Sequence, residues 1–264
     1  MKIIDIIKKI SVKQIIIAVL ACVVAFSAYK TVSILLGYNA ASNIYKDLGS
    51  EFVKPAYSDA GSGFVSVTDP DAKDTPPITV DFNSLKKVNE NIIGWIYCAD
   101  TAINYPIVKT ENAQDYDYYL SHLINGKKNS AGTVFMDYRN RQLCGDFNSI
   151  LYGHSMKNGT MFAHILRYRN QEFYDSHPYM WIYTPDAVYR LNVAAGYSVN
   201  ENSADYGMFS DSDAVKDYVK RVSTDSGFKT GTDLDAAQNI VQLSTCFAGD
   251  DMRFVLVCTV EKYD

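Results

Sequence analysis

The sequence predicts a mainly β fold, a barrel of mixed topology with helices inserted between its strands. Short runs of β-branched and aromatic residues follow one another closely from about residue 80 to the carboxyl terminus, and such spacing is typical of β-sandwiches and barrels. Helical patterns are fewer than strand patterns over the same region. The 20 tyrosines suit a β-rich fold, and 264 residues suffice for one large domain or two small ones.

The amino-terminal segment predicts a membrane anchor. Residues 15–29 read IIIAVLACVVAFSAY without a charge, and after Lys30 the apolar character continues to Tyr38. A lysine at position 30 can extend its ammonium group toward the headgroups, so Ile15–Leu36 supplies the roughly 20 residues that a bilayer requires. The positive-inside rule then predicts a cytoplasmic tail over residues 1–14 and an extracytoplasmic body. The lysines that precede the span are Lys2, Lys8, Lys9 and Lys13.

Two other interpretations of this segment remain open. It could be a cleaved secretory signal, with an apolar region at Ile15–Ala25 and the small residues Ser27 and Ala28 near the cleavage site. It could also be a buried helix of a soluble protein, although lysines on one flank alone favour the anchor. The anchor and the signal both predict a body outside the cytoplasm.

Residues 37–79 predict a helix and a linker. The sequence NAASNIYKDLGSEFVKP over residues 39–55 suggests a short helix that ends near Pro55. Tyr57–Thr79 is rich in Ser, Gly, Asp and Pro, a composition typical of linkers and mobile surface loops. Such a linker would let a folded domain over residues 80–264 stand off the membrane.

The elements of this domain can be predicted in order along the chain. A short helix is expected just after Asp81, before the first strand. Further helical patterns occupy Met161–Tyr168 and Asp213–Thr224, the second with Asp211 or Ser212 as its N-cap. The predicted strands are 93–98, 103–110, 133–137, 149–152, 179–184, 187–198 and the two arms of a hairpin over 240–260.

Charge and cysteine usage exclude several functional classes. Residues 1–36 carry a net charge of +4, so the remaining 228 residues carry −9 of the total of −5. An acidic body argues against nucleic acid, whose phosphates require a basic surface. The cysteines show no CxxC spacing, so neither a zinc site nor a dense disulfide framework is expected. They are Cys22, Cys98, Cys144, Cys246 and Cys258.

The final hairpin, IVQLSTCFAGDDMRFVLVCTV, has a cysteine and an arginine at the two ends of one loop. If Cys246 and Arg253 oppose each other, Cys258 points to the other face, which speaks against a Cys246–Cys258 disulfide. The arginine could favour the thiolate or donate hydrogen bonds to an oxyanion. A structural cysteine beside a surface arginine also fits this hairpin. The same register pairs Ser244 with Val255, Gln242 with Val257 and Val241 with Cys258.

A thiol nucleophile also requires a proton carrier, and His154 is the candidate. It follows the strand-like SILY and one glycine in LYGHSMKNGTMF, so it lies at a strand end, where catalytic groups collect. His122 and His177 lie in polar, loop-like settings and His164 lies in a helical pattern, which suit surface or packing roles. The sequence leaves open whether His154 and Cys246 are close in space.

Three segments, FMDYRN (135–140), LYGHSMKNGTMF (151–162) and LSTC followed by Arg253, present His, Cys and Arg in that order. Together they resemble class B sortases, membrane-anchored cysteine transpeptidases of Gram-positive bacteria. The resemblance covers residues 80–264 and the anchor. It implies a sortase-like β-barrel with a helix-bearing insertion, here Asp213–Thr224, before the cysteine strand. The sequence departs from the family pattern at Gln242, where a threonine is usual, and no role is assigned to Phe247.

The resemblance implies a role for each catalytic candidate. Cys246 attacks the threonine carbonyl of a carboxy-terminal sorting signal, of the NPxTG or PPxTG kind, in a secreted protein and forms a thioacyl-enzyme. His154 protonates the leaving amine and later deprotonates the incoming one. Arg253 stabilises the oxyanion or holds the signal in register. An amine of peptidoglycan or its precursor accepts the acyl group, and no metal or organic cofactor is needed.

Contacts with the signal follow from the same resemblance. Ser244 and Thr245 would form the floor of the groove. The segment DYDYYLSHL over residues 115–123 resembles the helix that lines it, which makes Leu120 a candidate, although Leu120 could equally be a core residue. The insertion around residues 206–219 should cover the groove.

Other functions remain open at this stage. A cysteine peptidase or amidase of the cell wall would use the same thiol and imidazole with water as acceptor. A membrane-anchored adhesin or scaffold would use Cys246 structurally. Among sortases, haem-protein anchoring, general surface display and pilus polymerisation are all open, and the class B resemblance favours the anchoring of single proteins.

Overall fold

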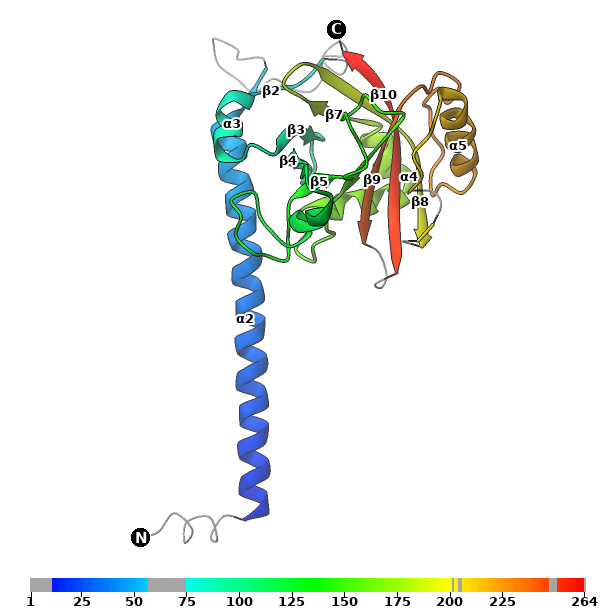
Figure 1. Cartoon of the computed structure of the whole chain (residues 1–264). Helices are drawn as coiled ribbons and strands as arrows, with labels where there is room; N and C mark the ends of the chain where they lie inside the picture. Colours follow the sequence, from blue (N-terminus) through cyan, green and yellow to red (C-terminus); the bar gives the residue numbers. More distant parts are fainter. Residues whose placement is uncertain (1–10, 57–74, 201, 204–205, 247–250, 264) are drawn as a thin grey trace, which may run out of the picture. The chain divides into compact units, whose positions relative to one another are not determined.

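The computed structural model describes residues 11–56, 75–200, 202–203, 206–246 and 251–263. Eight strands form a closed barrel in the order β10-β8-β7-β3-β4-β5-β6-β9 (Figure 1). Two neighbouring pairs are parallel, β4 with β5 and β6 with β9, and the others are antiparallel. The predicted barrel of mixed topology is therefore confirmed. Its strands are β3 Ile92–Tyr97, β4 Asn104–Val108, β5 Val134–Met136, β6 Asn148–Tyr152, β7 Tyr179–Tyr183, β8 Val188–Asn200, β9 Ile240–Cys246 and β10 Met252–Tyr263.

The β9–β10 hairpin has the predicted register. Cys246 pairs with Arg253, and the pairing continues down the ladder to Val241 and Cys258. Cys258 is fully buried and its thiol is free, which confirms that no disulfide joins it to Cys246. The loop residues 247–250 lie outside the described residues.

Helix α5, Ser212–Thr224, confirms the predicted insertion between β8 and β9. Its N-cap is Asp211, whose side chain accepts a hydrogen bond from the backbone amide of Ala214 at 2.8 Å. The apolar stripe of this amphipathic helix packs on the outside of the barrel beside β8 (Figure 1). The cluster that it completes consists of Val215, Tyr218, Val219 and Val222 from the helix and Ala194, Ala195, Tyr197, Ala237, Ile240, Val255 and Val257 from the barrel side.

Three helical predictions are corrected. The segment predicted over Met161–Tyr168 is a 3-10 helix, η4, at Phe162–Arg169. The segment 115–123 is no single helix but two short 3-10 turns, η2 at Ala113–Asp115 and η3 at Tyr118–Leu120. Each turn closes an i→i+3 bond and then stops, so neither extends into an α-helix. A short helix α4, Gln171–Ser176, was not predicted.

The third correction concerns the amino-terminal helix, α2, which is continuous over Val12–Phe52. No proline occurs in it, and the first one, Pro55, lies in the next strand. The chain divides into two compact units between Ala40 and Ala41, within this helix. In the part of the helix that belongs to the second unit, Ala41, Tyr45 and Leu48 are buried.

At 1.5 Å per residue α2 is about 60 Å long, roughly twice the hydrocarbon core of a bilayer. It is the one helix of the described chain that is long and apolar enough to cross a membrane, and its side chains up to residue 36 are exposed. The predicted domain limits at residues 36 and 79 remain predictions.

Two small elements precede the barrel. Strand β1, Val53–Pro55, pairs antiparallel with β2, Ile78–Val80, so the last residues of the predicted linker are in a strand. Residues 57–74 of that linker lie outside the described residues. Helix α3, Phe82–Val88, confirms the short helix predicted before the first barrel strand. Its N-cap is Asp81, whose side chain accepts from the amide of Ser84.

Candidate active site

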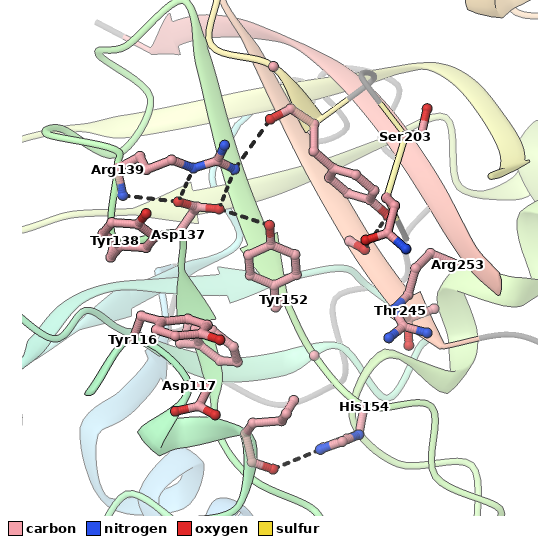
Figure 2. A pocket seen from close by; sticks show the side chains of 17 residues that line it. Tyr116, Asp117, Asp137, Tyr138, Arg139, Tyr152, His154, Ser203, Thr245 and Arg253 are labelled. Atoms are coloured by element: carbon pink, nitrogen blue, oxygen red, sulfur yellow. Dashed lines mark hydrogen bonds and ion pairs between the residues drawn. The ribbon is translucent and has the colours of Figure 1, made fainter. Parts of the chain in front are cut away.

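A cavity of about 660 Å³ opens at the carboxyl ends of β6 and β9. Its wall comes from η3, from the ends of β5 and β6, from the connection between β8 and α5, and from the β9–β10 hairpin (Figure 2). The lining residues are Tyr116, Asp117, Leu120, Phe135, Asp137, Tyr138, Arg139, Tyr152, Gly153, His154, Asn202, Ser203, Tyr206, Gly207, Ser244, Thr245 and Arg253.

The parallel pairing of β6 with β9 brings the predicted histidine and cysteine to one end of the barrel. Tyr152 pairs with Ser244 in this ladder. His154 follows Tyr152 by two residues and Cys246 follows Ser244 by two, so both positions continue in the same direction from adjacent strands. On the other side of β9, Arg253 pairs with Cys246. Residue 246 therefore lies between the strand that leads to His154 and the strand that carries Arg253.

Gly153 links the end of β6 to His154. The amide of Gly153 still donates to the carbonyl of Ser244 at 3.1 Å, which continues the β6–β9 ladder by one bond. A Cβ atom on Gly153 would lie 2.7 Å from the ring of Phe162, so a glycine is required for this close approach. The carbonyl of His154 accepts from the amide of Phe162 at 2.9 Å, which closes the loop over residues 155–161.

The same loop is fastened from the barrel side. Met161 has a left-handed backbone, with φ of 57°, and its amide donates to the hydroxyl of Tyr105 at 2.8 Å. The ring of Tyr105 makes an edge-to-face contact with Tyr45 of α2, with centroids 5.4 Å apart. The end of α2 thus supports the loop that follows His154.

The imidazole of His154 contacts the backbone of η3. Its Nε2 lies 2.7 Å from the carbonyl oxygen of Leu120. Because a carbonyl oxygen only accepts, Nε2 must carry the hydrogen of this bond. The other ring nitrogen, Nδ1, is then the one available for proton exchange when the ring is neutral. Figure 2 shows His154 on the side of the pocket where Thr245 and Arg253 also lie.

The β9 side of the pocket is polar. The hydroxyl groups of Ser244 and Tyr206 share a hydrogen bond of 2.9 Å. Thr245 is 2% exposed, and its hydroxyl has no hydrogen-bond partner among the described residues. Arg253 is half-buried, and its Nη1 donates to the carbonyl of Met252 at 3.2 Å. A buried hydroxyl and a cationic fork therefore adjoin the end of β9.

An ion pair forms the opposite wall. The carboxylate of Asp137 accepts three hydrogen bonds from Arg139, through its amide and Nε at 2.9 Å and its Nη2 at 2.8 Å. It accepts a fourth from the hydroxyl of Tyr152 at 2.8 Å. Burial alone would raise the pKa of Asp137, but these bonds and the charge of Arg139 outweigh it and hold that pKa below its ordinary value. Burial and the adjacent carboxylate raise the pKa of Tyr152.

The other histidines have local structural contacts outside the pocket. His122 stacks on Tyr118 and His177 stacks on Phe173. His164 Nδ1 accepts from the amide of Ala102 at 3.0 Å, and burial lowers the pKa of its imidazole. The surface or packing roles predicted for these three histidines agree with these contacts.

Comparisons with known proteins agree with this geometry. No protein-family model matches the chain. The sortase B of Listeria monocytogenes is 33% identical over 170 residues, which cover 63% of this chain and 67% of that protein. The chain belongs to the sortase B family. It is therefore a cysteine transpeptidase.

A further sortase B supports the assignment both in sequence and in structure. That of Staphylococcus aureus is 29% identical over 197 residues, covering 69% of this chain and 75% of that protein. A structure of the Staphylococcus aureus sortase B–substrate complex superposes with a TM-score of 0.63 at 26% identity, covering 69% of this chain and 85% of that one.

Five of the six predicted site residues of this sortase line the pocket: Leu120, His154, Ser244, Thr245 and Arg253. The sixth, Cys246, follows Thr245 at the end of β9. Leu120 is 41% exposed, so it is no core residue. Their chemical roles remain predictions.

Sequence reasoning missed the polar residues of the opposite wall. Asp137, Arg139 and Tyr152 lie inside the motifs FMDYRN and LYGHSMKNGTMF, so those motifs were the signal that could have found them. Tyr206 lies in the insertion that was predicted to cover the groove, although no single residue of it was named. Gln242, the departure from the family pattern, is buried and donates to the hydroxyl of Tyr218 on α5.

Proposed function

We propose that this sortase cleaves a carboxy-terminal sorting signal of the NPxTG or PPxTG kind between Thr and Gly. It then joins the surface protein to an amine of peptidoglycan or its precursor through a thioacyl-enzyme. The observation that carries the proposal is the backbone register around β9. His154 follows the neighbouring parallel strand, and Arg253 pairs with Cys246 across the hairpin.

Cys246 is the nucleophile in this proposal. Three other cysteines of the catalytic unit are buried thiols, and burial raises the pKa of Cys98 to about 11 and raises those of Cys144 and Cys258 as well. Thiols of this kind are poor sources of thiolate. Cys22 lies in the apolar part of α2. Positions two apart on a strand share a face, so residue 246 continues the face of Ser244, which lines the pocket.

His154 moves the protons. With Nε2 hydrogen-bonded to the Leu120 carbonyl, Nδ1 exchanges protons with the reacting groups. The thiol of Cys246 gives its proton to Nδ1 of His154, and the resulting thiolate adds to the threonine carbonyl. The C–N bond to glycine then breaks, and the imidazolium gives that proton to the leaving amine. The neutral imidazole then takes a proton from the incoming amine as that amine displaces the sulfur. Protons and charges balance over the two half-reactions.

Arg253 and Thr245 act on the carbonyl and the signal. The guanidinium of Arg253 stays protonated and can donate to the oxyanion of each tetrahedral intermediate. The hydroxyl of Thr245, which has no partner among the described residues, is a polar group for the backbone of an extended peptide. Leu120 and Ser244 complete the proposed contacts with the signal.

The proposed cellular location of the protein rests on α2. Its apolar part would anchor the chain as a single-pass protein, and the lysines before residue 14 would keep the amino terminus in the cytoplasm. The catalytic unit would then face the cell wall, where secreted proteins and peptidoglycan amines are available. This orientation is part of the proposal.

The test uses the full-length protein in detergent micelles. Fluorogenic peptides with NPxTG, PPxTG and scrambled motifs are incubated with and without a peptidoglycan-type amine, and products are identified by mass spectrometry. Cys246→Ala is the test variant, and Cys22→Ala is the matched control because it removes a thiol outside the catalytic unit.

The proposal predicts that the wild-type protein cleaves the peptide between Thr and Gly and forms an amine-ligated product. The Cys246→Ala variant should cleave no peptide, and the Cys22→Ala variant should cleave it at the wild-type rate. Hydrolysis without ligation, for every amine tried, would contradict transpeptidation and indicate a peptidase. Cleavage that survives Cys246→Ala would contradict the assignment of the nucleophile.

A further inference from the structure

The motif FMDYRN (135–140) contacts a distant segment of the chain. Residues 206–208, here called the wall segment, lie between β8 and α5 and include two residues that line the pocket. Arg139 Nη2 donates to the carbonyl of Tyr206 at 3.2 Å. Asn140 Nδ2 lies 3.6 Å from the sulfur of Met208. Arg139 therefore fastens the first residue of the wall segment by a hydrogen bond, and Asn140, whose Nδ2 donates to two closer oxygen acceptors, only contacts its last residue.

A third contact comes from the start of β6. Asn148, which is 1% exposed, donates through Nδ2 to the carbonyl of Gly207 at 2.8 Å. Asn140 in turn is fixed to β6, because its Nδ2 also donates to the carbonyl of Asn148 and its Oδ1 accepts from the amide of Ile150 at 2.9 Å. The wall segment is thus attached to a rigid strand by side chains rather than by a backbone ladder.

The ion pair with Asp137 orients Arg139 for its hydrogen bond to Tyr206. The carboxylate of Asp137 engages Nε and Nη2 of the guanidinium together, and the carboxylate is itself held by Tyr152. A planar guanidinium held at two nitrogens has little rotational freedom. The hydrogen that Nη2 directs at the Tyr206 carbonyl is therefore oriented before any peptide arrives. Figure 2 shows Asp137 between Arg139 and Tyr152 at one side of the pocket.

The wall segment also reaches the catalytic strand. The hydroxyl of Tyr206 shares a hydrogen bond with Ser244 on β9. A continuous set of polar contacts therefore runs from Asp137 through Arg139 and Tyr206 to Ser244, two residues before Cys246. It encloses the part of the pocket opposite His154, where the sorting signal would lie in the proposed function.

We propose that Arg139 is a positioning residue for signal recognition, which holds the wall segment against β9 through its contact with Tyr206 and so shapes the groove before binding. Arg139 acts through Tyr206 and not on the reacting atoms. Its loss should weaken capture of the signal more than it slows the chemistry at Cys246. This inference rests on the proposed function.

The experiment compares Arg139→Gln and Arg139→Lys with the control Arg141→Gln in the full-length protein. Arg141 is an exposed arginine two residues away that does not line the pocket. A lysine at position 139 retains the charge beside Asp137 but lacks the fork that reaches two acceptors at once. Five quantities are measured: KM and kcat for a cleaved sorting peptide, the rate of Cys246 alkylation by iodoacetamide, the deuterium exchange of residues 206–210, and the melting temperature.

The expected result is a KM raised about tenfold in both Arg139 variants, which corresponds to one lost charge-assisted hydrogen bond. The alkylation rate should stay within about twofold of wild type, since a small reagent does not use the wall. Exchange at residues 206–210 should rise, and Arg141→Gln should match wild type in every quantity.

Two results would overturn the inference. If KM and the deuterium exchange of residues 206–210 are both unchanged in the two Arg139 variants, the contact between Arg139 and Tyr206 does not position the wall segment. A parallel loss of kcat, alkylation rate and melting temperature would show a general role in folding. If the wild-type protein cleaves no peptide, the proposed function fails by itself, while the exchange of residues 206–210 still decides whether Arg139 holds the wall segment.

Discussion

The two sides of the pocket are held in different ways. On the His154 side, the loop over residues 155–161 is fixed by close packing of Gly153 on Phe162 and by a neutral hydrogen bond from Met161 to Tyr105. On the other side, the wall segment over residues 206–208 is fixed by an arginine that a buried carboxylate orients. The first side should therefore respond to changes of volume, and the second to changes of charge.

The largest effect is expected from Gly153→Ala, which tests the packed side. The added methyl would lie 2.7 Å from the Phe162 ring, so the ring or the backbone before His154 must move. Overpacking of this kind costs about 1–3 kcal/mol, and misplacement of a catalytic group by about 1 Å can lower kcat/KM by about 100-fold. Peptide cleavage and thermal unfolding measure the two effects.

Gly231→Ala is the control for this change, because a Cβ there meets its nearest atom, the Tyr174 hydroxyl, at an ordinary 3.7 Å. Full activity of Gly153→Ala would show that the His154 side does not depend on this contact.

Tyr105→Phe should have the next largest effect. It removes the acceptor for the Met161 amide and leaves that buried donor unpaired, at a cost of about 1–3 kcal/mol. Activity should fall more than stability alone explains, because the loop begins at the residue after His154. The measurement is kcat/KM at a temperature where unfolding curves show both proteins to be folded. A variant as active as wild type there would limit Tyr105 to a role in folding.

Asp137→Asn tests the side of the pocket that the ion pair holds, through the pH dependence of the melting temperature. Its effect is expected to be the smallest of the three. The pKa of Asp137 is lower in the folded protein than its ordinary value, so its ion pair stabilises the fold fully above about pH 4. That contribution is lost as the pH falls through the lower, folded-state pKa. Asp137→Asn should therefore melt below wild type at pH 6, and the difference should shrink toward pH 3.

A difference between the two melting temperatures that stays constant from pH 6 to pH 3 would contradict an ionised Asp137 in the folded protein. Gly153→Ala supplies the matched comparison, because a packing defect should lower the melting temperature by a similar amount at both pH values.

Local patterns predicted the fold well. The hairpin register followed from one assumption, that Cys246 opposes Arg253, because the side-chain period of a strand then fixes all other pairs. The cap of α5 is Asp211, one of the two residues that the sequence offered, because capping depends on a short-range side-chain contact. The length of α2 was underestimated, because the membrane span over Ile15–Leu36 and the short helix over residues 39–55 were predicted as two separate elements, whereas one continuous helix contains both.

The site could be predicted only in part, because its geometry depends on which strands become neighbours. The parallel pairing of β6 with β9 joins segments about 90 residues apart, and no local pattern specifies which strands become neighbours. The contact of Arg139 with Tyr206 spans 67 residues and depends on the same closure of the barrel. Motif resemblance predicted the residues that would touch the reacting groups, while the polar contacts of the opposite wall became visible only through the fold.

The most direct test of the account is to trap the acyl-enzyme. Full-length protein is mixed with a cleavable sorting peptide and quenched in acid before an amine can react, and the proteolytic fragments are weighed by mass spectrometry. The account predicts that the fragment containing Cys246 gains the mass of the peptide up to its threonine, and that His154→Ala removes this adduct. An adduct on any other residue, or turnover with Cys246 replaced by alanine, would contradict it.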